Sequence, residues 1–253
     1  MRRYALLLLL VSGCRSGLDE SKIIDLTHPF NDRTIYWPTA SRFELTKVAY
    51  GRDKEGHWYA SNDFCASEHG GTHLDAPIHF AEGRWSTAEI PMAKLIGPAR
   101  VIDVRKQCAA DSNYLLSPVD IRRHESKHGL IRPDTIVLIH TGFGQYYPDA
   151  ARYLGSERRG IVEGLRFPGI GKAAAELLVK RRIDLVGLDT ASLDHGPSKD
   201  FIAHRVLNEA NIPGLENVAN LDRLPPKGAT VIALPIKIEE GTGGPCRIIG
   251  ILP

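Results

Sequence analysis

The sequence has few sulfur-containing residues. Its 253 residues include four cysteines and two methionines, and Cys14, Cys65, Cys108 and Cys246 lie far apart. Neither the number nor the spacing of the cysteines indicates a disulfide-stapled scaffold or a compact zinc-ribbon motif. If Cys14 is modified, an odd number of thiols remains, so at least one of them is free in a monomer. We expect the other three cysteines to act as small buried apolar residues.

The sequence also lacks an excess of one charge. Its 32 basic and 30 acidic residues give a formal net charge of +2, and they are mixed along the chain without a sustained basic stretch. This distribution argues against a nucleic-acid partner. Apolar residues make up 43% and charged residues 25%. This composition is typical of a globular protein with a sizeable core and not of a disordered chain.

Repeats, low-complexity segments and membrane-length apolar runs are absent as well. The apolar run from Tyr4 to Val11 is too short for a bilayer core of ~30 Å. Two arginines precede this run and small residues follow it up to Cys14, which is the pattern of a secretory signal. The letters VSGC also resemble the lipobox of bacterial lipoproteins. We predict a signal peptide at residues 1–13 and a polar tether at residues 14–22.

This N-terminus decides the expected location. The predicted signal implies an exported protein, either periplasmic or held at a membrane by a lipid on Cys14. The alternative is a misassigned start or a disordered extension, and the protein is cytoplasmic if the signal is not used.

Beyond the tether, runs typical of strands and of helices are mixed. Apolar, β-branched runs that indicate buried strands occupy residues 23–30, 100–104, 135–143, 184–192, 229–238 and 247–252. Helices are predicted over residues 117–129, 172–182 and 203–212, and the first of them opens with a Ser-Pro cap. Strands and helices do not alternate strictly. We therefore expect residues 23–253 to form a single α/β domain with a mixed sheet.

The segment EHGGTHLDAPIHF, at residues 68–80, concentrates side chains that can bind a metal or carry a proton. These side chains are His69, His73, Asp75 and His79. The two glycines and the proline of the segment exclude an ordinary helix. In an extended chain His73 and Asp75 point to one face, and the glycines allow the backbone to curl so that His69 joins them.

Two imidazoles and a carboxylate that converge form the beginning of a zinc or manganese site, with donor atoms at ~2.0–2.2 Å from the ion. The alternative is a polar loop whose histidines only hydrogen-bond to the backbone. The wider sequence has to decide between the two.

The letters HGGTHLDAPIHF resemble a family motif. They match the His-x-Gly-Thr-His-x-Asp-x-Pro-x-His pattern of the cyclase-like metal-dependent hydrolases, the family of bacterial kynurenine formamidase and isatin hydrolase. The similarity includes DLTHPF and IYWP before the motif, VLIHTGF and GLDTASLD after it, and AHRVLNEANIPGLENVANLDRLP and GTGGPCRIIGIL toward the C-terminus. The resemblance implies an α/β fold of the swivelling type and a homodimer or larger homo-oligomer.

The resemblance also implies five metal ligands and one catalytic acid/base. The ligands are His69, His73, Asp75, His204 and Glu216, and the acid/base is His79. By themselves the two later ligands would be a surface histidine and a solvated glutamate, but a Pro-Gly turn before Glu216 allows the chain to double back. Five ligands exceed the needs of a closed tetrahedral zinc. We therefore expect two zinc ions bridged by carboxylates, or one manganese ion with open positions.

Such a site suits the hydrolysis of amides. A divalent ion acidifies a water molecule and polarises a carbonyl oxygen. His79 can take a proton from this metal-activated water and pass it to the leaving nitrogen. The alternative role for His79 is to orient Asp75.

The sequence thus predicts an enzyme that hydrolyses carbon–nitrogen bonds other than peptide bonds, acting on a small aromatic or cyclic amide. The leading hypothesis is an arylformamidase reaction of the kynurenine formamidase type, a step of tryptophan catabolism. Phe30, Tyr36 and Trp37 are expected to hold the aromatic ring. One alternative is a lactam-opening enzyme similar to isatin hydrolase, and another is a non-catalytic metal- or ligand-binding lipoprotein.

Overall fold

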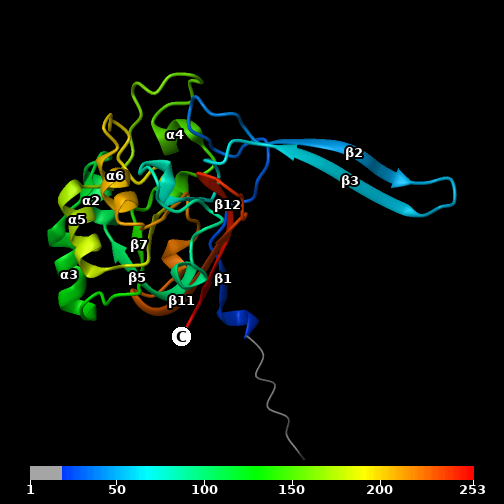
Figure 1. The fold of residues 1–253 in the computed structure, drawn as a ribbon. Coiled ribbons are helices and arrows are strands. Elements are labelled where there is room, and N and C mark those ends of the chain that lie inside the picture. Colours follow the sequence, from blue (N-terminus) through cyan, green and yellow to red (C-terminus); the bar gives the residue numbers. More distant parts are fainter. Residues whose placement is uncertain (1–18) are drawn as a thin grey trace, which may run out of the picture.

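A mixed β-sheet closes on itself to form the centre of the molecule (Figure 1). The computed structural model describes residues 19–253. The sheet runs in the order β1 (Ile23–Asp25), β12 (Gly243–Ile251), β11 (Lys227–Pro235), β5 (Ile96–Asp103), β7 (Ile136–His140), β9 (Leu185–Leu188), β10 (Gly214–Glu216) and β4 (His73–Asp75). Because β4 pairs with both β10 and β12, seven strands form a closed barrel and β1 adds an edge beside β12.

The strands of this barrel run in both directions, as the sequence predicted. The pairs β5–β7, β7–β9 and β9–β10 are parallel. The pairs that involve β1, β4, β11 and β12 are antiparallel. Parallel strands need crossover connections, and the helices supply them. The prediction of an α/β domain with a mixed sheet is therefore confirmed.

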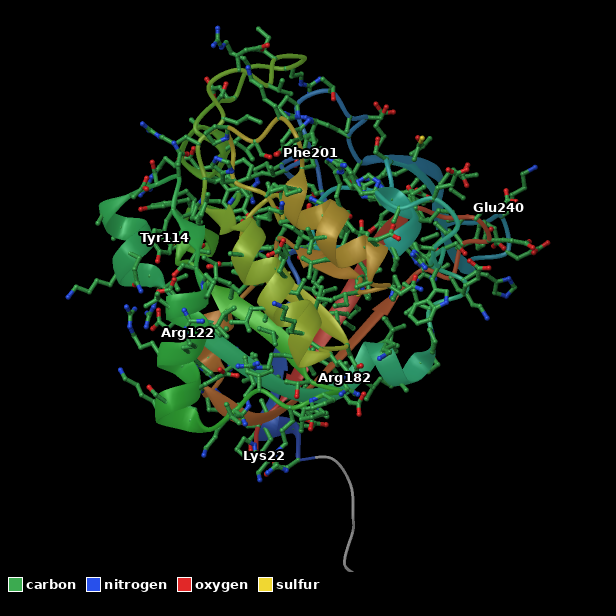
Figure 2. All side chains as sticks on the ribbon, turned by 60° about the vertical axis from the view of Figure 1, so that its left-hand side comes forward. Lys22, Tyr114, Arg122, Arg182, Phe201 and Glu240 are labelled. Carbon is green, nitrogen blue, oxygen red and sulfur yellow. The ribbon has the colours of Figure 1, made fainter. Side chains whose placement is uncertain are left out.

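Four helices cover the parallel strands on one side, at the left of Figure 1: α2 (Arg105–Ala110), α3 (Pro118–His128), α5 (Lys172–Arg181) and α6 (Ile202–Glu209). Two shorter helices lie elsewhere: α1 (Met92–Leu95) contacts β5 and β11, and α4 (Ala150–Leu154) lies beside the turn at residues 143–146. The helices predicted from the sequence correspond to α3, α5 and α6. At the start of α3, the Asp120 carboxylate accepts hydrogen bonds from the backbone N–H and the hydroxyl of Ser117, which secures the predicted cap. Charged side chains such as Arg122, Arg182 and Glu240 lie exposed on the outside (Figure 2).

Short elements complete the body of the protein. They are the 3-10 turns η1 (Glu20–Lys22), η2 (Pro77–His79), η3 (Phe143–Tyr146) and η4 (Leu221–Arg223), and the parallel pair β6 (Leu115–Leu116) and β8 (Gly169–Ile170).

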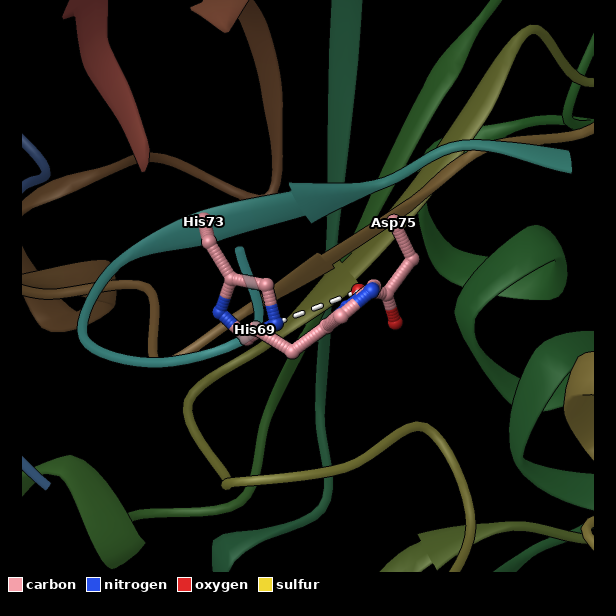
Figure 3. A group of neighbouring side chains, drawn as sticks. All are labelled: His69, His73 and Asp75. Carbon is pink, nitrogen blue, oxygen red and sulfur yellow. Dashed lines mark hydrogen bonds and ion pairs between the residues drawn. The ribbon is translucent and has the colours of Figure 1, made fainter. Parts of the chain in front are cut away.

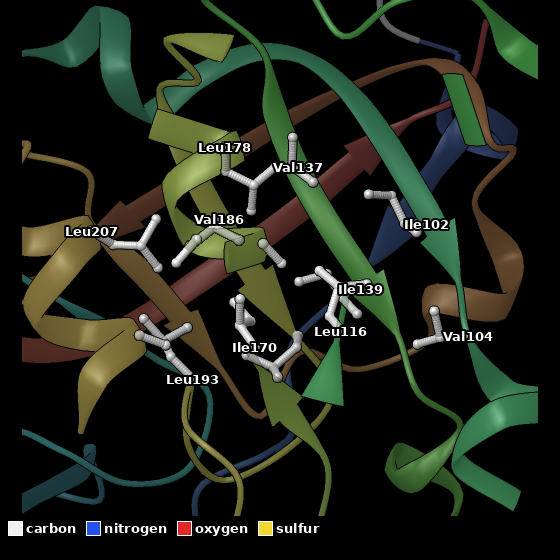
Figure 4. Packing of buried hydrophobic residues seen from close by; sticks show 14 of the residues in the cluster. Ile102, Val104, Leu116, Val137, Ile139, Ile170, Leu178, Val186, Leu193 and Leu207 are labelled. Atoms are coloured by element: carbon white, nitrogen blue, oxygen red, sulfur yellow. The ribbon is translucent and has the colours of Figure 1, made fainter. Parts of the chain in front are cut away.

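Strand β7 appears in the sequence as a continuous apolar run because both of its faces are buried. Successive side chains of a strand point to opposite faces. Val137 and Ile139 pack against the helices in one apolar cluster (Figure 4), and Ile136 and Leu138 belong to a second cluster with residues of the other barrel strands. All four side chains are buried. Each such side chain contributes on the order of 1.5–3 kcal/mol to folding.

A long two-stranded arm projects away from the body (Figure 1). It consists of β2 (Glu44–Arg52) and β3 (Trp58–Cys65), which pair with each other and with no other described strand. Sequence analysis did not predict these strands, because almost every residue of the arm is exposed and neither strand contains the continuous apolar run of a buried strand.

The cysteines divide into two groups. Cys108 and Cys246 are buried, as expected for small apolar residues, and burial raises the pKa of the Cys108 thiol to about 12. Cys65 is exposed at the end of β3. The expectation that all three are buried is therefore wrong for Cys65, because the strand that carries it leaves the body of the protein.

The predicted signal peptide at residues 1–13 and most of the predicted tether lie outside the described residues. The described part of that segment contains η1, and the carbonyl of Lys22 accepts a hydrogen bond from the backbone N–H of Leu252. Within residues 19–253, no helix combines the length and the apolar character needed to cross a membrane.

Candidate active site

Strand β4 holds the first predicted ligands at the seam that closes the barrel. In its antiparallel pairing with β10, His73 lies opposite Glu216 and Leu74 lies opposite Leu215. Side chains alternate along a strand, so Leu74 enters the apolar core whereas His73 and Asp75 share the other face. The sequence prediction of an extended piece with one polar face is confirmed here. Strand pairing adds Glu216 to that face.

Two glycines before β4 allow the chain to curl back. A side chain on Gly70 would lie 2.0 Å from the Tyr36 ring, and Gly71 adopts a left-handed φ of +58° with the Phe30 ring 2.7 Å from the position of a Cβ atom. Only glycine fits both positions without displacing these rings. The resulting turn places His69 Nδ1 2.7 Å from Asp75 Oδ1 (Figure 3).

Helix α6 adds the fifth predicted ligand, His204, and the cluster closes around Asp75. His73 Nε2 lies 3.1 Å from Asp75 Oδ1 and 3.5 Å from Glu216 Oε2. His204 Nε2 lies 3.1 Å from Asp75 Oδ2 and 3.2 Å from Glu216 Oε1. The cluster thus contains two groups of ligand atoms that share Asp75, one with His69 and His73 and the other with His204 and Glu216. All five predicted ligands come together.

The chemistry of this cluster fits a divalent cation. Asp75 and Glu216 are 1% and 5% exposed, and two carboxylates buried so close together require positive charge. Burial, together with the charge of Asp75, raises the pKa of Glu216. Burial opposes protonation of His73, but the charges of Asp75 and Glu216 prevail and raise its pKa to about 9. The same negative field would hold a metal ion, and imidazole nitrogens with carboxylate oxygens are donors that suit zinc or manganese.

The orientation of His73 supports this fit. Its Nδ1 donates a hydrogen bond to the carbonyl of Gly71 at 2.9 Å, because a carbonyl can only accept. When the ring is neutral, Nε2 therefore carries the free lone pair, and this buried atom has no hydrogen-bond partner among the described residues. Such an atom, directed at two carboxylates, is a ready ligand for a cation. The Gly71 carbonyl is held in turn by the Asn217 amide, which donates to it at 2.7 Å.

Asp194 orients His204, and sequence analysis did not predict this residue. Its carboxylate accepts hydrogen bonds from His204 Nδ1 at 2.7 Å and from the backbone N–H groups of Ala203 and His204 at 2.9 and 3.1 Å. These bonds satisfy the start of α6 and fix the imidazole so that Nε2 faces Asp75. The sequence held only a weak signal, an acidic residue ten positions before the histidine.

His79 lies beside the cluster and belongs to neither group of ligand atoms. Its ring stacks on His69 with ring centroids 3.9 Å apart, and the His204 ring lies edge-on at 5.9 Å. Burial, assisted by the neighbouring imidazoles, lowers the pKa of His79 to about 4. The imidazole is therefore neutral at neutral pH and can accept a proton.

A pocket of about 300 Å³ opens onto the cluster. The five predicted ligands and His79 line it, and its other walls are largely apolar or aromatic, formed by Ile35, Tyr36, Trp37, Phe80, Ala191 and Phe201. Trp37 packs edge-on against Phe201, which lies at the start of α6 (Figure 2), with centroids 6.2 Å apart. Phe80 and Phe201 are pocket residues that sequence analysis did not identify.

The three residues that were predicted to hold the substrate lie in two different places in the structure. Tyr36 and Trp37 line the pocket. Phe30 lies behind Gly71, with its ring against Phe43 at 5.7 Å, and faces a different groove beside β1 and β12. Phe30 supports the shape of the ligand loop, since it fills the space that a side chain at position 71 would need.

The closed barrel and its cluster of imidazoles and carboxylates beneath a small pocket define a metal-dependent hydrolase. The chain belongs to the cyclase family, whose model, described as "Putative cyclase", matches residues 24–195. The resemblance predicted from the sequence is therefore confirmed.

Sequence similarity to two enzymes extends over most of the chain. The isatin hydrolase of Roseibium aggregatum is 36% identical over 221 residues, which are 84% of this chain and 82% of that protein. The kynurenine formamidase of Bacillus cereus strain ATCC 14579 is 28% identical over 234 residues, 90% of this chain and 97% of that protein. Both relatives hydrolyse amide carbon–nitrogen bonds.

Two solved structures of isatin hydrolases superpose on most of this chain. Isatin hydrolase A from Labrenzia aggregata, bound to benzyl benzoate, superposes with a TM-score of 0.82 at 34% identity, covering 91% of this chain and 93% of that chain. A second isatin hydrolase, bound to the product analogue thioisatinate, gives a TM-score of 0.84 at 33% identity, with 92% of each chain covered.

Proposed function

We propose that this protein hydrolyses the amide carbon–nitrogen bond of a small, flat aromatic or cyclic amide. The observation that carries the proposal is the cluster of three imidazoles and two carboxylates at the base of a pocket with aromatic walls. A pocket of about 300 Å³ suits a molecule of one or two rings. Tyr36, Trp37 and Phe201 would contact the flat faces of such a substrate.

The five clustered side chains would hold the metal. Asp75 directs one oxygen toward His73 and the other toward His204, an arrangement that suits a carboxylate shared by two zinc ions. One manganese ion with a larger coordination number is the alternative. When bound, a divalent ion supplies Lewis acidity, which polarises the amide carbonyl and lowers the pKa of a water molecule.

His79 would move the proton in this reaction. Its neutral imidazole can accept a proton from the water that attacks the carbonyl carbon. A carbon–oxygen bond forms, the carbon–nitrogen bond breaks, and the protonated imidazole returns the proton to the leaving nitrogen. The stacked ring of His69 and the aromatic residues around His79 limit its contact with water.

Similarity favours a lactam such as isatin as the substrate. Identity to isatin hydrolase is 36%, against 28% for the kynurenine formamidase of Bacillus cereus strain ATCC 14579. The arylformamide predicted from the sequence is the second candidate, supported by the nearly full-length match to kynurenine formamidases. Both substrates carry a carbonyl on an aryl nitrogen, so the same residues would serve either one. The second candidate would give the protein a role in tryptophan catabolism.

The experiment compares kcat/KM for isatin, formanilide and N-formylkynurenine on protein loaded with zinc or manganese. A higher value for isatin supports the lactam, and a higher value for either formamide supports an arylformamidase. Binding of these compounds without turnover of any amide would overturn the enzymatic proposal in favour of a non-catalytic binding protein.

Further features of the protein follow from the family and from the N-terminus. We propose that the barrel is of the swivelling type and that the protein is a homodimer, as in the sequence prediction. We also propose an exported lipoprotein anchored through Cys14. Replacement of Cys14 by Ser should then move the protein out of the membrane fraction. An unmodified Met1 on a cytoplasmic protein would contradict the anchor.

A further inference from the structure

A second cavity lies at the carboxyl ends of the parallel strands β5 and β7. These ends are adjacent, because Asp103 of β5 pairs with His140 of β7. The segments that follow parallel strands meet at one edge of a sheet, where α/β proteins commonly bind ligands. The cavity has a volume of about 430 Å³ and lies between α2, η3 and α4. Among the described residues it shares none with the substrate pocket.

The charged side chains that line this cavity are arginines. They are Arg105, Arg152 and Arg166, and no carboxylate of residues 19–253 lines the cavity with them. Ion pairs in this part of the chain include Arg105 with Asp103, but none involves Arg152 or Arg166. The Arg152 guanidinium lies over the Tyr146 ring, 4.4 Å from its centre. We call this site the arginine cavity. Its concentration of positive charge favours an anionic ligand.

The loop after β7 fixes the position of Arg105. Gly142 has a left-handed φ of +85°, and a Cβ atom there would lie 3.1 Å from Arg105 Cγ, so the arginine side chain crosses the loop where no side chain stands. The buried Asp189 carboxylate accepts hydrogen bonds from the backbone N–H groups of Thr141 and Gly142 at 2.7 and 2.9 Å. Asp103 holds the guanidinium itself, with Oδ2 2.7 Å from Nη2.

A second glycine brings the other two arginines to the same cavity. Gly155 ends α4 with a left-handed φ of +79°, and a Cβ atom there would lie 2.9 Å from Arg166 Cβ. The backbone N–H of Arg166 donates a hydrogen bond to the carbonyl of Leu154 at 2.7 Å. The chain at Arg166 therefore lies directly against the last turn of α4, the helix that carries Arg152. Both backbones are fixed, while both guanidinium groups remain exposed to a ligand.

The arginine cavity has the groups for binding and lacks those for catalysis. Cys108 lines it, but burial raises the pKa of this thiol to about 12, so it is not a nucleophile at neutral pH. The other polar side chains, Ser112, Thr141 and Gln145, are two hydroxyls and an amide. No imidazole or carboxylate of the described chain lines the cavity to activate them.

We propose that the arginine cavity binds a small phosphate monoester through its phosphate group. Guanidinium groups bind phosphate oxygens through paired, charge-assisted hydrogen bonds. A phosphate monoester presents three terminal oxygens that three guanidinium groups can share, whereas a carboxylate presents two. Cavities of this size accept molecules larger than a free phosphate ion, and Ala109 and Tyr146 would contact the organic part. This inference goes beyond the proposed function and depends neither on the substrate nor on the metal.

The test is isothermal titration calorimetry of the full, metal-loaded chain at low ionic strength, since salt screens exposed charges. The probes are glycerol 3-phosphate, inorganic phosphate and succinate. One variant carries Arg152→Gln and Arg166→Gln, and a second carries Arg105→Gln. The matched control carries Arg122→Gln and Arg182→Gln, which remove the same charge from exposed positions on the outside of the molecule (Figure 2). These variants change exposed side chains, so circular dichroism spectra should match the wild type.

Wild type and control should bind glycerol 3-phosphate with equal Kd. Binding should weaken about tenfold for each guanidinium lost, and so about 100-fold in the Arg152 and Arg166 double variant. Amide hydrolysis should be unchanged in that variant, because the arginine cavity is separate from the substrate pocket. Inorganic phosphate should bind more weakly than the monoester, and succinate more weakly than both.

Three outcomes would overturn the proposal. Phosphate binding that is absent in the wild type, or equally strong in the arginine variants, would show that the arginine cavity is not an anion site. Tighter binding of succinate would assign the cavity to a dicarboxylate, and tighter binding of inorganic phosphate would assign it to the free ion. None of these outcomes bears on amide hydrolysis, so failure of this inference leaves the proposed function in place.

Discussion

At the scale of single residues, a variant of His79 tests the catalytic step separately from metal binding. Its ring contacts His69 but belongs to neither group of ligand atoms. Replacement of His79 by Ala should therefore keep the metal and lower kcat by roughly 10² to 10⁴, the usual contribution of general acid/base catalysis. Elemental analysis and steady-state kinetics check both parts. His128→Ala, at the end of α3, is the control and should retain full activity. A His79 variant that loses its metal would instead make His79 a ligand.

Asp194 acts at the same scale by positioning another residue. Its carboxylate fixes the His204 imidazole through Nδ1 and satisfies two N–H groups at the start of α6. Asp194→Ala should lower metal affinity about 10- to 100-fold and destabilise the fold by about 1 to 3 kcal/mol. Chelator competition measures the affinity, and 15N chemical shifts of His204 report its tautomer. The exposed Asp200→Ala variant is the control. An unchanged tautomer with unchanged affinity would contradict the positioning role.

His28 should make the fold sensitive to acid. Its ring stacks on Tyr147 at 3.8 Å, and burial lowers its pKa to about 4. The unfolded chain therefore binds more protons below pH ~6.5, so stability should fall as the pH drops from there toward 4. The loss is of the order of 3 kcal/mol for this one group.

The variant His28→Phe keeps an aromatic ring and should flatten that part of the curve of unfolding free energy against pH. His57→Phe, on a side chain 78% exposed, should not. Equal slopes for wild type and His28→Phe would refute the assignment.

At the scale of elements, the turn before β4 connects backbone conformation with ligand placement. Gly71 has a φ of +58°, and a Cβ atom there would lie 2.7 Å from the Phe30 ring. Gly71→Ala should destabilise the fold by about 2 to 4 kcal/mol, from the left-handed conformation and the overpacking together, and should weaken metal binding. Gly83→Ala is the control, since its φ is +70° with no atom within 4 Å of the added Cβ. Denaturant unfolding compares the two. Equal losses would show that the contact with Phe30 costs little.

Elements differ in how far the sequence predicts them. Apolar, β-branched runs predicted β5, β7, β9, β11 and β12, of which β7 and β9 are buried on both faces, and three helices were predicted from their caps and composition. The same reasoning missed β2 and β3, whose side chains are exposed on both faces. The motif with its family resemblance supplied all five side chains that the structure clusters around Asp75. Asp194 was missed because only the fold brings it to His204. Phe30 was misplaced because the sequence does not show that its ring packs behind Gly71.

At the scale of the whole molecule, barrel closure brings distant segments together. The loop that ends in β4 carries His69, His73 and Asp75, while His204 and Glu216 follow more than one hundred residues later in the chain. They meet because β4 pairs with β10 on one side and with β12 on the other. A cation in the cluster would therefore link α6, β4 and β10 directly, and the stability of the barrel should depend on it.

Removal of the metal should consequently affect both activity and the fold. Treatment with a chelator should abolish amide hydrolysis and lower the melting temperature, because a ligand at 1,000 times its Kd stabilises a fold by about 4 kcal/mol. Addition of zinc or manganese should restore both, and elemental analysis should give one or two ions per chain. The variant Asp75→Ala removes the residue common to both groups of ligand atoms, so it should melt at the lower temperature whether or not the chelator is present. If the chelator leaves the wild type active and equally stable after all metal is gone, the cluster is held together by its protonated imidazoles alone and the hydrolase does not need a metal.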